Sequence, residues 1–167
     1  MAKLANTFVL EKIKSQFEKF IFGSEEPYGL LTVIADRSIN LELLQFLKDD
    51  VQLQHSFLTD ITAVHYPHTD HELCVVYHVH SFINRHRVRL KFYLPTGDAS
   101  IRSATAVYLG ANWMERETYD FFGINFIGHP NLKRILNMDE LEVFPMRKEY
   151  PLEDPNRVDK KDYFFGR

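Results

Sequence analysis

Residues 73–94, LCVVYHVHSFINRHRVRLKFYL, decide the fold of this chain. Large apolar side chains occupy every second position of two runs, residues 73–79 and 88–94, and the second run places Arg, Lys and Tyr between them. Alternation with a period of two is typical of β-strands that bury one face. The segment around Asn84 separates the two runs. We therefore predict an antiparallel hairpin with one face toward a core and a basic outer face on its second strand.

Two helices are predicted in the first third of the chain. Apolar side chains at three- and four-residue spacing indicate a helix that begins at Asn6 or Thr7 and ends at Gly23. A second helix is predicted from a cap at Ser38 to about Asp49, because leucines recur there at three-residue spacing.

Strands and a third helix complete the expected fold. Residues 30–35 and 57–66 are rich in β-branched and apolar side chains, which favours strands. Residues 100–122 are predicted to be mostly helical with a kink near Gly110, and Gly123 stands where a left-handed residue ends a helix. The sequence thus predicts an α+β fold in which a small mixed or antiparallel sheet is flanked by about three helices.

Composition excludes several classes of protein. The chain has 167 residues, a hydrophobic fraction of 45% and a formal net charge of −3, so a single core domain is expected and a nucleic-acid-binding footprint is not. Its one cysteine, Cys74, cannot build a disulfide framework, a zinc knuckle or an iron–sulfur cluster within the chain. No apolar run approaches the length of a membrane span, and the first residues lack the core of a signal peptide. We expect a cytoplasm-like, reducing environment.

The last 31 residues differ from the rest. Residues 137–167 are rich in charge and interrupted by Pro145, Pro151 and Pro155, which forbid a long helix, yet they carry five aromatic side chains. We therefore divide the chain into a core domain, residues 1–136, and an extended C-terminal arm, residues 137–167, that anchors on a partner.

Five histidines suggest a metal site as one alternative. His78 and His80 share a strand face, and three more histidines precede them at His65, His68 and His71. No carboxylate pattern completes a known metal motif, so we favour solvent-facing imidazoles on a hairpin and expect no bound metal.

Glu115 and Glu117 suggest a general acid and base as another alternative. Residues two apart on a helix point about 200° away from each other, so these carboxylates cannot share a site. No G-x-S-x-G nucleophile motif and no phosphate-binding glycine loop is present. We expect no catalytic and no cofactor-binding residue in this chain.

Residues 113–136, WMERETYDFFGINFIGHPNLKRIL, are both apolar and charged. That mixture predicts a surface shaped to be buried against another protein. Arg116 and Asp120 are four residues apart and can pair on one helical face. Lys133 and Arg134 could meet acidic groups of a partner or form a solvated basic patch, and both alternatives stay open.

These residues resemble a known family. The segment ERETYDFFGINFIGHPNLKRIL is similar to the signature of the C subunit, or 30 kDa subunit, of the proton-pumping NADH:quinone oxidoreductase, respiratory complex I. FLTDITAVHYP, VVYHVHSF, HRVRLKFYLP and GANW upstream, and PMRKEYPL downstream, resemble further family segments in the same order. Residues 139–144 depart from the family pattern, so the partner contact at this point is expected to differ.

The resemblance implies a set of signature and interface residues. They are Trp113, Glu115, Arg116, Glu117, Tyr119, Asp120, Phe122, Gly123, Phe126, Gly128, His129, Pro130, Lys133, Arg134, Leu136, Arg147, Tyr150 and Pro151.

The resemblance also implies a role. In that family the C subunit is a non-catalytic brace in the peripheral arm. It lies beside the quinone-binding D subunit, and beside the B subunit with the terminal iron–sulfur cluster; the subunits labelled G and I are further candidate neighbours. FMN and the Fe–S clusters belong to partner subunits, and neighbouring subunits bind quinone. The chain is expected on the cytoplasmic side of the bacterial inner membrane, attached only through the complex.

Two rival hypotheses remain. One is the equivalent subunit of a related membrane-bound hydrogenase or chloroplast-type complex. The other is a free-standing enzyme with a metal bound by the histidine cluster.

Overall fold

A five-stranded mixed sheet forms the centre of the fold. The computed structural model describes residues 4–95 and 97–150. The strands lie in the order β1 (Ile21–Glu25), β2 (Leu31–Ala35), β5 (His86–Leu94), β4 (Leu73–Ser81) and β3 (Phe57–His65). Only β2 and β5 run parallel; all other neighbours in this sheet are antiparallel. The predicted α+β fold with a small mixed sheet is therefore confirmed.

The hairpin of β4 and β5 forms as predicted. Leu73 lies opposite Leu94, and Val79 lies opposite Val88. The alternate apolar residues of both strands belong to the hydrophobic core cluster, in which Tyr77 and Phe92 are completely buried. The rings of these two residues meet edge to face with their centroids 5.6 Å apart.

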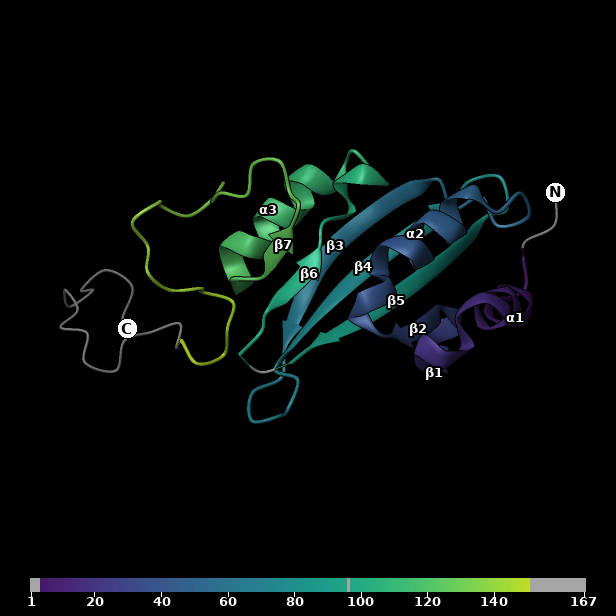
Figure 1. Cartoon of the computed structure of the whole chain (residues 1–167), viewed down its shortest axis with the longest axis horizontal. Coiled ribbons are helices and arrows are strands. Elements are labelled where there is room, and N and C mark those ends of the chain that lie inside the picture. The colour runs from purple at the N-terminus through teal and green to yellow at the C-terminus, as the bar shows by residue number, and fades with distance from the viewer. Residues whose placement is uncertain (1–3, 96, 151–167) are drawn as a thin grey trace, which may run out of the picture.

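Three α-helices accompany the sheet (Figure 1). Figure 1 shows α1 (Asn6–Phe17) and α2 (Asn40–Asp49) over one face of the sheet. The helix α1 lies near β1 and β2, and α2 lies across the middle of the sheet. The third helix, α3 (Ala111–Phe122), packs along the edge strand β3, and the Thr118 hydroxyl donates to the Ile61 carbonyl at 3.2 Å. The helices and the sheet thus enclose a single core.

The N-terminal helix is shorter than predicted. It ends at Phe17, a short 3-10 turn follows, and Gly23 lies inside the strand β1 instead of ending the helix. Ala5, which has no capping group, precedes the helix, and Asn6 is its first residue. The Asn6 side-chain oxygen lies 2.9 Å from His86 Nε2, and its amide donates to Glu26 and to the Gly29 carbonyl. The sequence did not predict β1, because its pairing with β2 is a contact between strands and leaves no periodic pattern within the segment itself.

The second helix also begins differently. Asp36, not Ser38, supplies the capping oxygen: it accepts from the Ser38 backbone N–H at 2.7 Å. The capped element is a 3-10 turn, Arg37–Ile39, which leads directly into α2.

The prediction of a mostly helical segment over residues 100–122 is wrong in its first half. A short strand, β6 (Ser100–Arg102), pairs in parallel with β7 (Asn125–Ile127), and a 3-10 turn, Ala104–Ala106, follows it. The partner strand is more than 20 residues away along the chain, so local periodicity could not reveal it. Gly123, by contrast, ends α3 in the left-handed region as predicted, with φ 71°.

The C-terminal arm is described as far as Tyr150. It contains no helix or strand over residues 137–150, and residues 151–167, Pro151 among them, lie outside the described part. Its division from the core as a separate unit stays a prediction. Within the described ranges, no helix has the length and apolarity needed to cross a membrane.

Candidate functional site

The helix α3 carries charged residues of the segment 113–136 on both its buried side and its exposed side. Glu115 and Asp120 are completely buried and Arg116 is 7% exposed, whereas Glu117 is exposed and Trp113 is 64% exposed. The expectation that Glu115 and Glu117 point in different directions is confirmed. Buried charges must be satisfied within the chain, and only the exposed residues can meet another molecule directly.

Glu115 holds the entry to α3 in place. Its carboxyl oxygens accept from the Ser103 hydroxyl at 2.6 Å and from the Ala104 backbone N–H at 2.5 Å. Burial raises the pKa of this carboxyl to about 7, although the two hydrogen bonds act in the opposite direction. The side chain therefore fastens the 3-10 turn after β6 to the helix.

Asp120 organises the segment that follows the helix. Its carboxylate accepts from Arg134 Nη1 at 2.8 Å and from the backbone N–H groups of Ile135, Leu136 and Asn137 at 3.1, 2.8 and 3.0 Å. Burial favours the neutral acid, but the backbone N–H groups of Asn137 and Leu136 and the Arg134 guanidinium prevail and hold its pKa well below its usual range. A carboxylate with so many donors is a strong anchor.

The predicted pair of Arg116 and Asp120 does not form. Arg116 instead donates to the carbonyls of Lys133 and Arg134, both at 3.2 Å, and its guanidinium lies 4.8 Å from the centre of the Trp113 ring. Arg134 takes the place beside Asp120. A spacing of four residues permits contact, but here the tertiary contacts of both groups prevail.

Arg134 and Arg147 attach the arm to the core. Arg134 donates to the carbonyls of Leu141 and Val143, and its side chain is 8% exposed. Arg147 Nε donates to the Phe122 carbonyl at 2.6 Å. Arg134 fits neither of the two alternatives left open, because it is internal and paired with Asp120. Lys133 is exposed, and for it both alternatives stay open.

Gly123 is required both for its backbone and for its lack of a side chain. A Cβ atom here would lie 2.5 Å from the Phe144 ring, which also stacks beneath Arg134 and Arg147. Tyr119 meets the same ring edge to face. Phe144 was not selected from the sequence, because it falls in the segment that departs from the family pattern.

His129 is an internal bridge. Nε2 donates to the Asn112 carbonyl at 3.0 Å, and Nδ1 accepts from the Asn131 backbone N–H at 3.0 Å. Both ring nitrogens of His129 therefore have backbone partners, which fix the orientation of the ring.

The remaining sequence-selected residues divide by exposure. Phe122 and Phe126 are buried, and Tyr150 is half-buried. The other residues reach solvent, namely Gly128, Pro130, Lys133 and Leu136.

Apolar side chains gather on the exposed side of this region. A hollow of about 540 Å³ is lined by Trp113, Arg116, Lys133 and Arg134, among others. Around α3 and the segment after it, large side chains that are more than half exposed are Trp113, Ile127, Leu136, Met138 and Met146. Met138 and Met146 were not selected from the sequence. Exposed apolar groups next to fixed charges are typical of a protein interface.

The histidine cluster does not assemble a metal site. His78 Nε2 accepts from Arg89 Nε at 2.9 Å, and His65 Nδ1 accepts from the Lys148 backbone N–H at 2.9 Å. Across residues 4–95 and 97–150, no three His, Cys, Asp or Glu side chains are grouped to hold a metal ion. A guanidinium against the ring of His78 would also repel a cation.

Comparison with known proteins gives one consistent family. The profile of the family described as respiratory-chain NADH dehydrogenase, 30 Kd subunit, matches residues 33–156. The C subunit of NADH-quinone oxidoreductase from Citrifermentans bemidjiense is 45% identical over 91% of this chain and 93% of that protein. The equivalent proteins of Geobacter sulfurreducens (91% of this chain, 93% of that protein) and Roseiflexus sp. (89% and 86%) are 39% and 40% identical.

Two solved structures share the fold. A trypsin-resistant fragment (1-134) of Nqo5 superposes with a TM-score of 0.67 and 28% identity over 77% of this chain and 100% of that chain. A chain of the membrane-bound sulfane sulfur reductase, an archaeal respiratory membrane complex, has a TM-score of 0.74 at 20% identity, over 93% of this chain and 96% of that chain. At that identity the second likeness concerns the fold alone.

Proposed function

Because the chain belongs to the family of the respiratory-chain NADH dehydrogenase 30 kDa subunit, we propose that it is a non-catalytic structural subunit of NADH-quinone oxidoreductase. The single observation that carries this role is the division of charges on α3. Glu115, Arg116 and Asp120 are all used to hold the chain's own segments, while Trp113, Glu117 and Lys133 remain on the surface. The buried charges of the helix thus serve structure, and its exposed residues are available for docking.

The proposed partners are the quinone-binding D subunit, the iron–sulfur B subunit, and those labelled G and I as further candidates. Electrons would pass from NADH through FMN and Fe–S centres of partner subunits to quinone, coupled to proton translocation. This chain contributes no redox ligand in the proposal: burial raises the pKa of the Cys74 thiol to about 12, which disfavours the thiolate that a cluster needs. The complex would hold the chain on the cytoplasmic side of the bacterial inner membrane.

A related membrane complex is the second candidate. The likeness to the sulfane sulfur reductase chain, at 20% identity, concerns the fold alone, whereas relatives named as the C subunit of NADH-quinone oxidoreductase reach 45%. The higher identity favours the NADH-quinone oxidoreductase. The genes that flank this one would separate the two candidates, because an NADH-dependent complex requires genes for its FMN-containing input module.

Co-purification tests the proposed function. The tagged chain, expressed in place of the native protein, is extracted with its membranes in mild detergent, and the quinone-binding and iron–sulfur partners should be recovered with it. The variant Glu117→Lys with Lys133→Glu changes two exposed charges without a net charge change, and we expect it to lower that recovery at least fivefold. Its melting temperature in isolation should stay within about 3 °C of wild type, because surface substitutions change stability little.

The control is Lys14→Glu with Glu11→Lys on α1, another charge swap at exposed positions. It should leave recovery unchanged. Absence of both proposed partners from the wild-type preparation would contradict the proposed function itself.

A further inference from the structure

A basic hollow lies where the hairpin of β4 and β5 meets the 3-10 turn Pro27–Gly29. It has a volume of about 380 Å³. Within residues 4–95 and 97–150, no aspartate or glutamate lines it. The polar side chains of its lining are two arginines, two histidines, an asparagine and a tyrosine, namely Arg85, Arg87, His80, His86, Asn6 and Tyr28. The whole chain has a net charge of −3, so this hollow gathers positive charge on an acidic protein.

Arg85 and Arg87 differ from the other arginines that the structure describes. Each of the others donates at least one hydrogen bond, namely Arg37, Arg89, Arg102, Arg116, Arg134 and Arg147. Among residues 4–95 and 97–150, Arg85 and Arg87 have neither a hydrogen-bond partner nor an ion-pair partner, and both line the basic hollow. Their guanidinium donors are therefore available to a ligand.

Two further donors line the basic hollow. His80 lies directly opposite Arg87 in the ladder of β4 and β5, a position that brings their Cβ atoms to about 5 Å from each other. Burial and the Arg87 guanidinium lower the pKa of His80, so its ring is neutral at pH 7 and has one N–H to donate. The Tyr28 side chain is fully exposed, and its hydroxyl bonds to no described residue. The hollow thus offers an imidazole and a phenol beside its two guanidinium groups.

The turn that carries Arg85 is fixed by the chain itself. The side-chain amide of Asn84 donates to the carbonyls of Gln52 and Leu53, both at 2.9 Å. Arg85 has a left-handed backbone with φ 50°, and so has Tyr28 with φ 56°. Residues other than glycine rarely adopt this conformation, and it concentrates at ligand sites, where the surrounding contacts enforce it. Two such residues line this one hollow.

The buried side of the basic hollow is also hydrogen-bonded. His86 is 1% exposed, its Nε2 lies 2.9 Å from Asn6 Oδ1, and its Nδ1 lies 3.1 Å from His55 Nε2. The Asn6 amide donates to the Gly29 carbonyl at 3.2 Å and to Glu26 at 3.0 Å. The Glu26 carboxylate is thus bound to Asn6 and does not line the hollow. This network gives the site a fixed floor beneath the two arginines.

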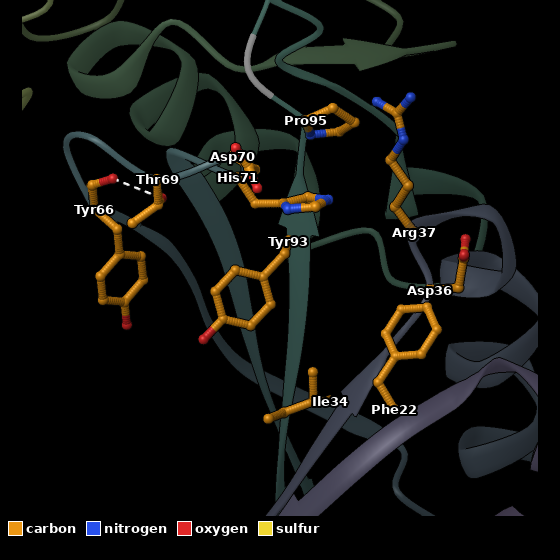
Figure 2. A pocket seen from close by; sticks show the side chains of 10 residues that line it. All are labelled: Phe22, Ile34, Asp36, Arg37, Tyr66, Thr69, Asp70, His71, Tyr93 and Pro95. Carbon is orange, nitrogen blue, oxygen red and sulfur yellow. Dashed lines mark hydrogen bonds between the residues drawn. The ribbon is translucent and has the colours of Figure 1, made fainter.

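A larger hollow on the molecule has a different character. It has a volume of about 630 Å³, and Figure 2 shows Asp36 and Asp70 around it together with Arg37 and His71. Arg37 is already paired with Asp98. Because charges of both signs line this larger hollow, its chemistry does not select an anion, whereas that of the basic hollow does.

We propose that the basic hollow binds a phosphate monoester group, with Arg85 and Arg87 as its main contacts. Such a group carries close to two negative charges at pH 7 and three acceptor oxygens, which match two guanidinium groups and the donors beside them. A carboxylate has one charge and two oxygens, so it would leave one guanidinium uncompensated. The volume lies within the range of small-molecule sites, about 300–1,000 Å³, and leaves room for the organic part of the ester.

Titration of the full chain with phenyl phosphate at constant ionic strength tests this binding. In heteronuclear NMR spectra, we expect the side-chain N–H signals of Arg85 and Arg87 and the ring signals of His80 to shift and saturate. Arg85→Gln with Arg87→Gln should weaken binding at least about tenfold, because each guanidinium makes charge-assisted hydrogen bonds to phosphate. The melting temperature of this variant should stay within about 3 °C of wild type, because neither side chain bonds to the rest of the protein.

The control removes the same two charges elsewhere. Lys14→Gln with Lys19→Gln changes exposed positions that follow Asn6 by at least two helical turns, and it should bind phenyl phosphate within twofold of wild type. Acetate at the same ionic strength should bind at least about tenfold more weakly than phenyl phosphate, because it carries one charge.

Vesicles distinguish the two sources of the phosphate monoester. Phosphatidic acid presents this group on a membrane, and phenyl phosphate presents it in solution. Co-sedimentation with vesicles of phosphatidylcholine and phosphatidic acid that is lost in Arg85→Gln with Arg87→Gln would support a lipid headgroup as the ligand. Saturable binding of phenyl phosphate without such co-sedimentation would support a soluble ester.

Four outcomes would overturn the inference. The first is no saturable shift up to about 10 mM phenyl phosphate together with no binding to the phosphatidic acid vesicles. The second is an equal loss of binding in the lysine control, which would assign the effect to net charge. Acetate binding as tight as that of phenyl phosphate would assign the hollow to a carboxylate. Equal binding to vesicles of phosphatidylglycerol, a diester, would leave only a general attraction to anionic surfaces. The inference is independent of the proposed function, since co-purification with the partner subunits tests that function separately.

Discussion

At the scale of the residue, the charges around α3 are structural before they are anything else. Glu115, Arg116 and Asp120 each satisfy backbone groups of segments that follow or precede the helix. Because removing one partner of a buried charge leaves the other groups unsatisfied, each of these residues constrains its neighbours strongly.

Gly123 offers a matched comparison with Gly128. Both have a positive φ, 71° and 84°, but an added Cβ meets Phe144 only at Gly123. Gly128→Ala should lower the free energy of unfolding by about 1 kcal/mol, because alanine disfavours the left-handed backbone. Gly123→Ala should lower it by at least about 1 kcal/mol more, because the added Cβ also clashes with the Phe144 ring. Urea unfolding of the isolated chain measures both values. Equal costs would show that the Phe144 ring moves aside freely.

Glu115 should make stability depend on pH in an unusual direction. Its pKa is about 7 in the folded chain against a reference value of 4.5, so the folded state binds more protons between these values and stability falls as pH rises through that window. Burial lowers the pKa of His55 to about 4, which produces the opposite trend from about pH 4 to 6.5. The two effects partly cancel in the wild type.

The variant Glu115→Gln isolates the first effect. It retains an oxygen acceptor for Ala104 N–H but does not ionise, so its unfolding free energy should gain about 2 kcal/mol on the wild type between pH 5 and pH 8. Chemical denaturation at a series of pH values checks this. A difference that does not change with pH would mean that Glu115 is ionised throughout.

At the scale of the element, α3 acts as the anchor of the arm. Asp120 fixes residues 135–137, and Arg147 and Phe144 fix the later part against the helix end. A segment without a helix or strand depends on such side-chain contacts, because it lacks the regular backbone hydrogen bonds of those elements.

Asp120→Asn should therefore loosen the arm. The side-chain amide would place its own N–H group next to the donors that Asp120 now accepts from. We therefore expect the free energy of unfolding to fall by about 3 kcal/mol. Hydrogen exchange should show lost protection at the Leu136 and Asn137 amides, which donate to Asp120. Asp139→Asn, at an exposed position, is the control and should change neither quantity. Retained protection in Asp120→Asn would place the anchor elsewhere.

At the scale of the whole molecule, the single cysteine reports on the fold. Cys74 is completely buried, and burial raises its pKa to about 12. A maleimide should therefore react with it only after the sheet opens, about 10⁴-fold more slowly than with a free thiol if the chain is stable by about 6 kcal/mol. The rate should rise with urea in parallel with unfolding. Fast labelling without urea would indicate local opening of β4.

The limits of prediction from sequence follow the range of the interactions. The hairpin, the strands β2 and β3, and the left-handed Gly123 were predictable, because period-two alternation and a helix-ending glycine are local signals. The strands β1, β6 and β7 were not, since each is short and owes its existence to a partner strand. The docking character of residues 113–136 stays a prediction, and the exposed residues Met138 and Met146 could not be selected from the sequence.

The sequence by itself determined the α+β class, the core face of the sheet and membership of the family, because these rest on side-chain pattern and motif order. Only the tertiary structure decided which charges are internal. Arg116 and Asp120 are adjacent on α3 by spacing, yet each bonds to groups 14 to 18 residues away. A buried charge takes whichever partners the fold brings to it after desolvation, and those partners follow from packing between segments that no local pattern records.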